Sequence, residues 1–280
     1  MKSSTSFVCQ QCGYESLQWL GKCPECNEWN SLKEFRIQSS EFKAKGKGSK
    51  LQAEDIQPKK LEKISFLEKN RINTTFLEAD GVLGGGIVPG SVILLAGDPG
   101  IGKSTLLLQI ALLISQKMDV LYVSGEESEG QVKLRAKRIG NLEKAKNFLL
   151  LSTTNINAVL NVIEGSKPGL VIIDSIQTME SESLGGLSGS IGQIRYATSM
   201  LIKAAKILNI PIILVGHVTK EGMVAGPMIL SHMVDCVLFL EGEKATGTRI
   251  LRSLKNRFGP IDEVGVFIMG EEGLTEAKNP

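Results

Sequence analysis

The sequence predicts an α/β fold with a mainly parallel central sheet, preceded by a small cysteine-rich module. Apolar runs alternate with amphipathic stretches over residues 61–280, the pattern of strands followed by helices. A glycine-rich stretch, GDPGIGKST, connects one apolar run to the next amphipathic stretch. Four of the five cysteines form two C-x2-C pairs within the first 26 residues.

Composition divides the chain into three parts. Residues 1–35 hold the cysteine pairs and both tryptophans, and residues 36–60 carry seven Lys or Arg against three acids. We expect 36–60 to be a basic flexible linker, because it has no periodic apolar face. Residues 61–280 then form the α/β domain. The net charge of the whole chain is only +2, so overall charge does not indicate a nucleic-acid-binding protein.

The apolar runs of the third part are expected to be strands. The earlier ones are almost continuously apolar, as in parallel strands that are buried on both faces, and the last three favour an antiparallel extension. Helices are expected at 103–116, 129–139, 156–164 and 193–208. Strands are expected at 91–97, 119–125, 148–152, 170–174, 210–216, 234–240, 248–255 and 264–269.

The sequence also argues against a membrane protein. No stretch approaches the roughly 18 apolar residues of a membrane-spanning helix, and the first residues lack the apolar run of a signal peptide. Cysteine pairs in an intracellular chain bind metal more often than they form disulfides. We therefore expect a cytoplasmic protein without a membrane partner.

The cysteine pairs are spaced like the ligands of a structural zinc site. Each C-x2-C pair can present two thiolates to one ion, and two pairs complete a tetrahedral four-cysteine site with no position left for a substrate. Metal binding would stabilise a segment too short to bury a core of its own. A redox pair or an unligated thiol cluster is the alternative. The expected Zn²⁺ ligands are Cys9, Cys12, Cys23 and Cys26.

The stretch GDPGIGKST fits the phosphate-loop pattern G-x-x-x-x-G-K-[ST] and lies between an expected strand and an expected helix. Its glycines let backbone N–H groups approach phosphate oxygens at a helix N-terminus. We expect Lys103 to neutralise the β- and γ-phosphates and Ser104 to bind Mg²⁺ through its hydroxyl. The expected nucleotide-binding residues of the loop are Gly97, Asp98, Pro99, Gly100, Ile101, Gly102, Lys103, Ser104 and Thr105.

Three further polar positions follow expected strands. Asp174 ends LVIID and suits the carboxylate that accompanies Mg²⁺. Glu126 and Glu127 follow YVSG, and either can orient the attacking water; we favour Glu126 as the base. His217 in LVGHVTK can sense the γ-phosphate, or it can be a histidine satisfied by local hydrogen bonds.

Two glycine-bearing polar loops are expected at 180–195 and 219–232. Loops of this length are commonly functional or disordered. Arg195 and Lys220 within them can contact DNA phosphates, although two solvated surface loops would look the same.

The stretch LKNRFGP, residues 254–260, places two cations two positions apart. In an extended chain Lys255 and Arg257 point to one face, and Asn256 and Phe258 point to the other. Phe258 is then expected to pack behind the cations, and Gly259-Pro260 to end the strand. The cations can serve catalysis, contact DNA phosphate, or protect an edge strand from aggregation.

Seven segments together resemble the bacterial RadA/Sms family of DNA recombination and repair ATPases, whose core is RecA-like and related to the DnaB helicases. The resemblance covers nearly all of 7–280 except the linker. Its most specific parts are the cysteine ribbon and KNRFG. The segments are CQQCGYESLQWLGKCPECNEWN, VLGGGIVPGS, GDPGIGKST, YVSGEES, IDSIQT, GHVTKEG and KNRFG.

The resemblance implies a DNA-dependent ATPase that uses ATP, Mg²⁺ and Zn²⁺. It implies homo-hexameric rings that move on single-stranded or branched DNA and drive branch migration alongside the RecA recombinase. By position, Lys103 and Ser104 match the Walker A residues, Asp174 the Walker B acid, and Glu126 the glutamate after the strand. The cysteines match the zinc ligands. Members of the family continue into a C-terminal domain that resembles the Lon protease fold and helps to bind DNA, and the sequence given ends where that domain would begin.

In the context of such a ring, Lys255 and Arg257 are expected to reach the ATP of a neighbouring subunit as catalytic cations, with Arg257 contacting DNA phosphate as the rival role. Two other functions remain as alternatives. One is a nucleotide-switch ATPase on a RecA-like core, as in the KaiC group. The other is an adaptor that binds ATP and recruits a partner through the ribbon without motor activity.

Overall fold

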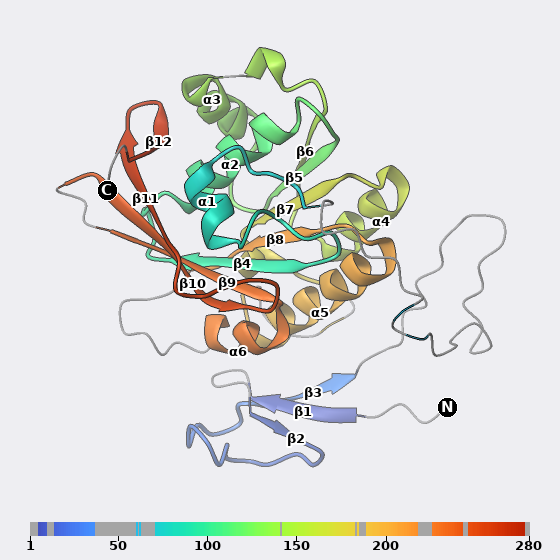
Figure 1. Cartoon of the computed structure of the whole chain (residues 1–280). Coiled ribbons are helices and arrows are strands. Elements are labelled where there is room, and N and C mark those ends of the chain that lie inside the picture. The colour runs from blue at the N-terminus through green and yellow to red at the C-terminus, as the bar shows by residue number, and fades with distance from the viewer. Residues whose placement is uncertain are drawn as a thin grey trace.

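The computed structural model describes residues 5–9, 14–36, 60, 62, 71–140, 142–182, 184, 189–217, 226–242 and 246–277. Figure 1 shows a central twisted sheet with helices on both faces, together with a small three-stranded ribbon from the N-terminal part. Apart from its two end residues, the expected linker lies outside the described residues. No helix among the described residues is long and apolar enough to cross a bilayer.

Within the described part of the chain, the central sheet contains nine strands in the order β12-β11-β10-β9-β4-β8-β7-β5-β6. The six strands from β9 to β6 are parallel, and β10, β11 and β12 add an antiparallel extension beyond β9. The α/β fold expected from the apolar runs is confirmed. The strands are β4 (Val92–Gly97), β5 (Val120–Ser124), β6 (Phe148–Ser152), β7 (Leu170–Asp174), β8 (Ile212–Val215), β9 (Cys236–Gly242), β10 (Thr248–Asn256), β11 (Val264–Gly270) and β12 (Gly273–Glu276).

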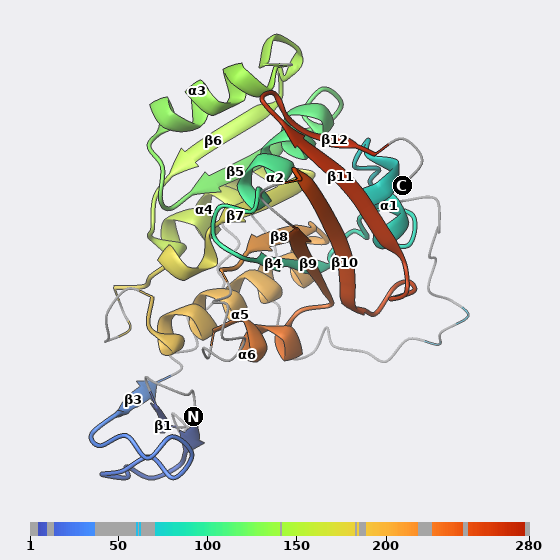
Figure 2. The same cartoon turned by 90° about the vertical axis from the view of Figure 1, so that its left-hand side faces the viewer.

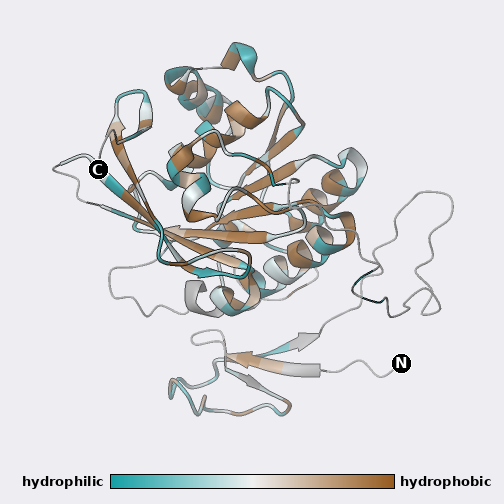
Figure 3. Ribbon diagram, in the orientation of Figure 1, coloured by the Kyte–Doolittle hydropathy of each residue, from teal (hydrophilic) through white to brown (hydrophobic). Residues whose placement is uncertain are grey.

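Two apolar cores lie on opposite faces of the sheet. Helices α1, α2 and α3 cover one core, and α4, α5 and α6 cover the other (Figures 1 and 2). Figure 3 shows apolar residues along the strands and on the helix faces that are turned toward the sheet, as expected for a sheet that is buried on both sides. The helices are α1 (Leu77–Val82), α2 (Lys103–Ile114), α3 (Glu129–Ile139), α4 (Ile156–Ser166), α5 (Ile191–Leu208) and α6 (Gly226–Met233).

Local signals set several helix ends. Ser128 and Gln131 form a capping box at the start of α3, and the Asn155 side chain accepts two backbone N–H groups at the start of α4. Helix α5 ends at Asn209, which adopts the left-handed conformation that commonly terminates helices. These helices begin or end within about two residues of the expected positions.

Two α-helices and one strand of the described α/β domain were not expected from the sequence. Helix α1 has only six residues and no side-chain cap at its start. It is too short for a periodic apolar pattern to reveal it in the sequence. Strand β12 pairs with β11, and its Leu274 exchanges two hydrogen bonds with the amide of Gln109 on α2, 165 residues away. Helix α6 occupies the end of the stretch 219–232, which was expected to be a loop.

The N-terminal ribbon is a small antiparallel sheet with the order β2-β1-β3. Its strands are β1 (Thr5–Cys9), β2 (Glu15–Ser16) and β3 (Leu32–Arg36). Among the described residues of the ribbon, the core consists of Cys9, Cys23 and Leu32, with three partly buried side chains around them. So small a core needs a further source of stability, and metal binding is the source that the cysteines offer.

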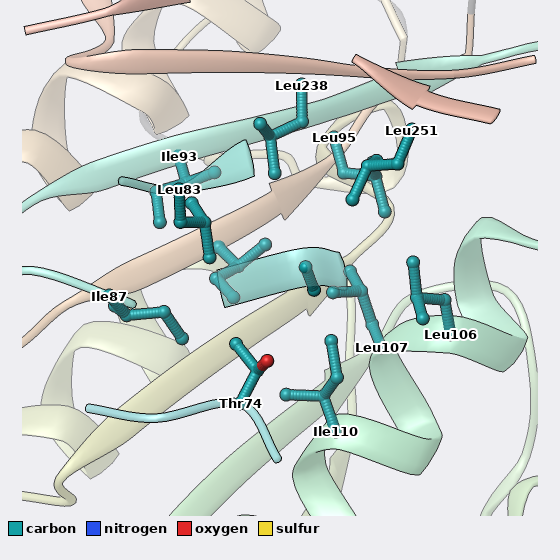
Figure 4. Close-up of a pocket in the computed structure, with 12 residues that line it drawn as sticks. Thr74, Leu83, Ile87, Ile93, Leu95, Leu106, Leu107, Ile110, Leu238 and Leu251 are labelled. Atoms are coloured by element: carbon teal, nitrogen blue, oxygen red, sulfur yellow. The ribbon is translucent and has the colours of Figure 1, made fainter. Parts of the chain in front are cut away.

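A small cavity of about 20 Å³ lies between α1, α2 and the sheet (Figure 4). Every side chain that lines it is apolar except that of Thr74. The cavity has space for about one water molecule and offers almost no polar partner. It is a packing defect of the core, and the nucleotide site must be located from the phosphate loop instead.

Candidate nucleotide site

The phosphate loop connects β4 to α2. Gly97 and Gly102 both have positive φ angles, of 150° and 116°. A Cβ atom would collide with the Leu240 carbonyl at the first position and with Met269 at the second. Only glycine therefore allows this loop to pack against β9 and β11 while its backbone N–H groups remain at the start of α2.

Lys103 is the first residue of α2, and only 3% of it is exposed. Its ammonium donates to the carbonyls of Gly97, at 2.8 Å, and Asp98, at 2.9 Å, so it lies inside the curve of the loop. Burial lowers the pKa of Lys103 to about 8, although the negative charges of Asp174, Asp98 and Glu126 oppose part of this shift. A buried cation in a phosphate loop is the arrangement that binding of a polyphosphate requires.

Ser104 and Asp174 come together although 70 residues separate them in the chain. The Ser104 hydroxyl donates to Asp174 Oδ1 at 2.9 Å, and the exposed fraction of Asp174 is 7%. Mg²⁺ prefers oxygen ligands, and one hydroxyl and one carboxylate are the protein ligands usual in phosphate-loop proteins. The donor set therefore fits magnesium.

The two glutamates after β5 have different neighbours. Glu126 accepts a hydrogen bond from the Ser175 hydroxyl at 2.6 Å and lies 3.3 Å from Nε2 of His217. Glu127 forms a 2.7 Å ion pair with Arg135 on α3. Glu127 is thus held by a cation on α3, whereas Glu126 lies among residues from the ends of neighbouring strands.

His217 follows β8, which lies between β4 and β7 in the sheet. Its ring contacts Glu126, and its carbonyl accepts a hydrogen bond from Gln177 at 3.4 Å. Lys103, Glu126, Asp174 and His217 therefore meet at the carboxyl edge of the parallel strands, where ligands bind in open α/β sheets.

Arg249 was missed by sequence reasoning, which treated it as part of a strand. It is on β10 and only 5% exposed, and its Nε donates to the carbonyl of Ile101 in the phosphate loop at 2.8 Å. It supports the loop through this carbonyl, whereas Lys103 contacts the carbonyls of Gly97 and Asp98. An arginine in an apolar strand is the one signal that could have drawn attention to it.

Lys255 is turned toward its own chain. Its ammonium donates to the carbonyls of Ser231, at 2.6 Å, and Val234, at 2.8 Å, at the end of α6. Burial lowers the pKa of Lys255, and the nearby charge of Arg257 adds to this effect. A cation at this position stabilises the carbonyls at the C-terminus of a helix.

Arg257 is on the same side as Lys255, as the alternation predicts, but it is more exposed. Its guanidinium lies 3.5 Å from Asp235, and 57% of the side chain is accessible to solvent. Asp235 also pairs with Lys206 at 2.7 Å and accepts the backbone N–H of Val92. Arg257 is therefore only weakly held within this chain.

Phe258 differs from the expectation. It lies beside Lys206, with 6.0 Å between the ammonium and the ring centre, and so is on the side of the cations and not behind them. The reason is that β10 ends at Asn256, whose side chain accepts the N–H of Phe258 and turns the chain. Arg71 holds this turn by donating to the Phe258 carbonyl at 2.7 Å.

Besides Arg257, two residues were expected to contact DNA, and the structure describes one of them. Arg195 belongs to the first turns of α5, because this helix begins at Ile191 within the stretch 180–195 that was expected to be a loop. Lys220 lies outside the described residues. A DNA-binding role for either residue stays a prediction.

Three of the four expected zinc ligands converge. The sulfur atoms of Cys9, Cys23 and Cys26 lie within 4.8 Å of one another, and those of Cys9 and Cys26 are 3.6 Å apart. Tetrahedral zinc with bonds of about 2.3 Å would place sulfur atoms about 3.8 Å apart. The described thiols therefore fit zinc, and Cys12 lies outside the described residues.

Two parts of the chain match known protein families. Residues 57–223, which include the phosphate loop, Glu126, Asp174 and His217, match the family described as AAA domain. The chain belongs to the AAA domain family. Residues 7–34, ahead of the AAA domain, match a rubredoxin metal binding domain.

Curated relatives of this AAA domain chain are named for DNA repair. The chain is 48% identical over its whole length to DNA repair protein RadA of Streptococcus pyogenes serotype M6, and it covers 60% of that protein. It is 46% identical over its whole length to DNA repair protein RadA of Bacillus subtilis, of which it covers 61%. The chain thus spans about 60% of the length of these relatives.

Solved structures support the RecA-like fold. A structure described as the RadB recombinase aligns with 74% of this chain and 99% of its own, with a TM-score of 0.58 and 25% identity. A second structure, described as an ATPase domain, aligns with 74% of this chain and 91% of its own, with a TM-score of 0.62 and 17% identity. The second likeness concerns the fold alone.

Proposed function

We propose that the chain is a magnesium-dependent ATPase of recombinational DNA repair. The observation that carries the proposal is the convergence of Lys103, Ser104, Asp174 and Glu126 at one edge of the sheet. The name shared by relatives at 46–48% identity supports the DNA repair context. We propose in the same way that the protein is cytoplasmic and that DNA is its partner.

Within this proposal, each residue has a distinct task. Backbone N–H groups of 97–105 and the buried ammonium of Lys103 bind the phosphates. Ser104 and Asp174 hold Mg²⁺, which supplies positive charge against the β- and γ-phosphate oxygens when bound. The Glu126 carboxylate orients and deprotonates the attacking water, because Ser175 fixes its position and, among the described residues, it forms no ion pair with a lysine or an arginine.

His217 connects hydrolysis to the loops that follow β7 and β8. Its ring contacts Glu126, and its backbone contacts Gln177 in the short 3-10 helix after β7. A change at the γ-phosphate would therefore be transmitted to the two segments that carry Arg195 and Lys220. We propose that these segments and Arg257 bind single-stranded DNA.

The finer proposal is a homo-hexameric ring that drives branch migration together with the RecA recombinase. In such a ring Arg257 supplies a positive charge to the ATP of a neighbouring subunit. Its 57% exposure and its long contact with Asp235 support this role. Lys255 supports the role of Arg257 indirectly, because its hydrogen bonds to the end of α6 fix the chain two residues before Arg257.

The first test is turnover. ATP hydrolysis is measured with and without single-stranded DNA for the wild-type chain and for Lys103→Ala. We expect hydrolysis that increases with DNA and disappears in the variant. ATP binding without product would contradict the ATPase and support the adaptor, and hydrolysis that DNA does not change would favour the nucleotide switch.

Two further measurements address the partners. DNA affinity should decrease steeply with salt concentration if lysine and arginine side chains bind phosphates, and a flat dependence would contradict that mode of binding. The mass of the complex with an ATP analogue and single-stranded DNA should equal six chains if the ring forms. A monomeric mass would contradict the ring for this chain.

A further inference from the structure

Two side chains beside Asp174 form a connected chain of hydrogen bonds. Tyr122, in the middle of β5, is fully buried, and its hydroxyl donates to Asp174 Oδ2 at 2.5 Å. Arg135, on α3, donates to the oxygen of this hydroxyl at 3.3 Å. The same guanidinium nitrogen lies 3.7 Å from Asp174 Oδ2. The contacts therefore lead from α3 through β5 to the end of β7.

The direction of the hydrogen bonds follows from their chemistry. A guanidinium can only donate, so the Tyr122 oxygen accepts from Arg135 and directs its own proton to Asp174. A phenolic hydroxyl is protonated at neutral pH, so it remains a donor.

Both side chains are held in place. The Tyr122 ring stacks on Phe148 of β6, with 5.9 Å between the ring centres. Arg135 is fixed by its 2.7 Å ion pair with Glu127. Neither side chain can change its contact with Asp174 without losing another contact.

We propose that Tyr122 and Arg135 are positioning residues for the magnesium carboxylate. They occupy Asp174 Oδ2 and leave Oδ1, the oxygen that Ser104 contacts, available to Mg²⁺. This inference rests on the proposed function, because the ion concerned is the Mg²⁺ that accompanies a nucleoside triphosphate. Arg135 acts through Tyr122, by fixing the direction in which the hydroxyl donates.

The physical consequence concerns metal affinity. Without the hydroxyl, a buried carboxylate oxygen loses its donor and the carboxylate is free to rotate. Residues that hold a metal ligand in place typically change metal affinity by about 10- to 100-fold when they are replaced. Tyr122→Phe keeps the ring and its stacking on Phe148, so it removes the hydroxyl alone.

The test is a Mg²⁺ titration of binding of a fluorescent, non-hydrolysable ATP analogue to the 280-residue chain. We expect Tyr122→Phe to raise the Mg²⁺ midpoint about 10- to 100-fold and to leave metal-free binding of the analogue unchanged. Arg135→Gln should shift the midpoint in the same direction. Arg138→Gln removes the same charge from an exposed position on α3 and should leave the midpoint unchanged.

The double variant shows whether Arg135 acts on Asp174 through Tyr122 or independently of it. If Arg135 acts through Tyr122, Tyr122→Phe combined with Arg135→Gln shifts the midpoint no further than Tyr122→Phe alone. Additive shifts of the midpoint would overturn the claim that Arg135 acts through Tyr122. If Tyr122→Phe does not fold, Arg135→Gln, at a position where 15% of the side chain is exposed, decides alone, and an unchanged midpoint overturns the proposal.

Two other outcomes separate this inference from the proposed function. An equal loss of binding with and without metal would mean general damage to the site and would overturn the inference. A wild-type chain that binds no nucleotide, or that binds it with no dependence on Mg²⁺, would overturn the proposed function itself. Mn²⁺ bound in the presence of nucleotide, detected by electron paramagnetic resonance, checks the metal directly.

Discussion

The guanidinium of Arg135 lies 2.7 Å from the carboxylate of Glu127, while the adjacent Glu126 is directed toward Ser175 and His217. Two neighbouring glutamates, of which the sequence favoured Glu126 as the base, therefore have different environments. We expect Glu126→Gln to lower kcat for ATP hydrolysis by about 10²- to 10⁴-fold, because the base is lost. Nucleotide affinity, measured with a fluorescent analogue, should stay nearly constant.

The matched control is Glu127→Gln. This variant removes one ion pair that is partly exposed, which is worth about 1 kcal/mol or less. Hydrolysis should fall by less than about tenfold. If Glu127→Gln abolished turnover while Glu126→Gln did not, the assignment of the base would be reversed.

Nucleotide binding should depend on pH through Lys103. The pKa of this ammonium is lowered to about 8 in the chain without nucleotide, and bound phosphate favours the charged form. Binding above this pH must take up a proton, so affinity is constant below the pKa and falls above it by at most about tenfold per pH unit. A binding titration between pH 7 and 10 measures this.

Lys103→Arg is the control for this pH dependence. An arginine stays charged throughout that range, so affinity should no longer decrease with rising pH, whatever its absolute level. If the decrease persisted in Lys103→Arg, another group would be responsible.

The role of Arg257 can be tested by mixing variants. If Arg257 acts on the ATP of a neighbouring subunit, Arg257→Ala and Lys103→Ala are each inactive alone. A mixture regains part of the activity, because some sites combine an intact phosphate loop with an intact arginine. A contact with DNA instead predicts normal basal hydrolysis in Arg257→Ala and loss of stimulation by DNA.

Lys255 and Arg257 should differ in their effect on stability. Lys255→Ala removes hydrogen bonds to three carbonyls at the end of α6, so it should lower the free energy of unfolding by about 1 kcal/mol. Arg257→Ala should cost less, because Asp235 keeps its pair with Lys206. Urea unfolding of the two variants compares them, and equal losses would contradict the helix-capping role of Lys255.

Zinc removal should affect only the ribbon. The two tryptophans of the chain, Trp19 and Trp29, are both in this part, so tryptophan fluorescence reports it selectively. A strong chelator should change this fluorescence and leave analogue binding to the AAA domain unchanged. Loss of nucleotide binding on chelation would argue against an independent ribbon.

Much of the fold follows from short-range patterns. The eight expected strands are present within about two residues, because continuous apolar runs mark buried parallel strands. The capping box of Ser128 and Gln131 marks the start of α3 in the same local way. Strand β12 could not be predicted, since it depends on the Gln109 amide on a distant helix.

The features of the candidate site also fall into those set by neighbouring residues and those set by contacts between distant elements. The sequence by itself determined the phosphate loop, the strand-end positions of Asp174 and Glu126, and the spacing of the cysteines, because each of these depends on a few neighbouring residues. Only the tertiary structure decided that Glu127 pairs with Arg135 and that Lys255 caps α6. These contacts join side chains from different elements, and their partners are selected by how the helices pack against the sheet.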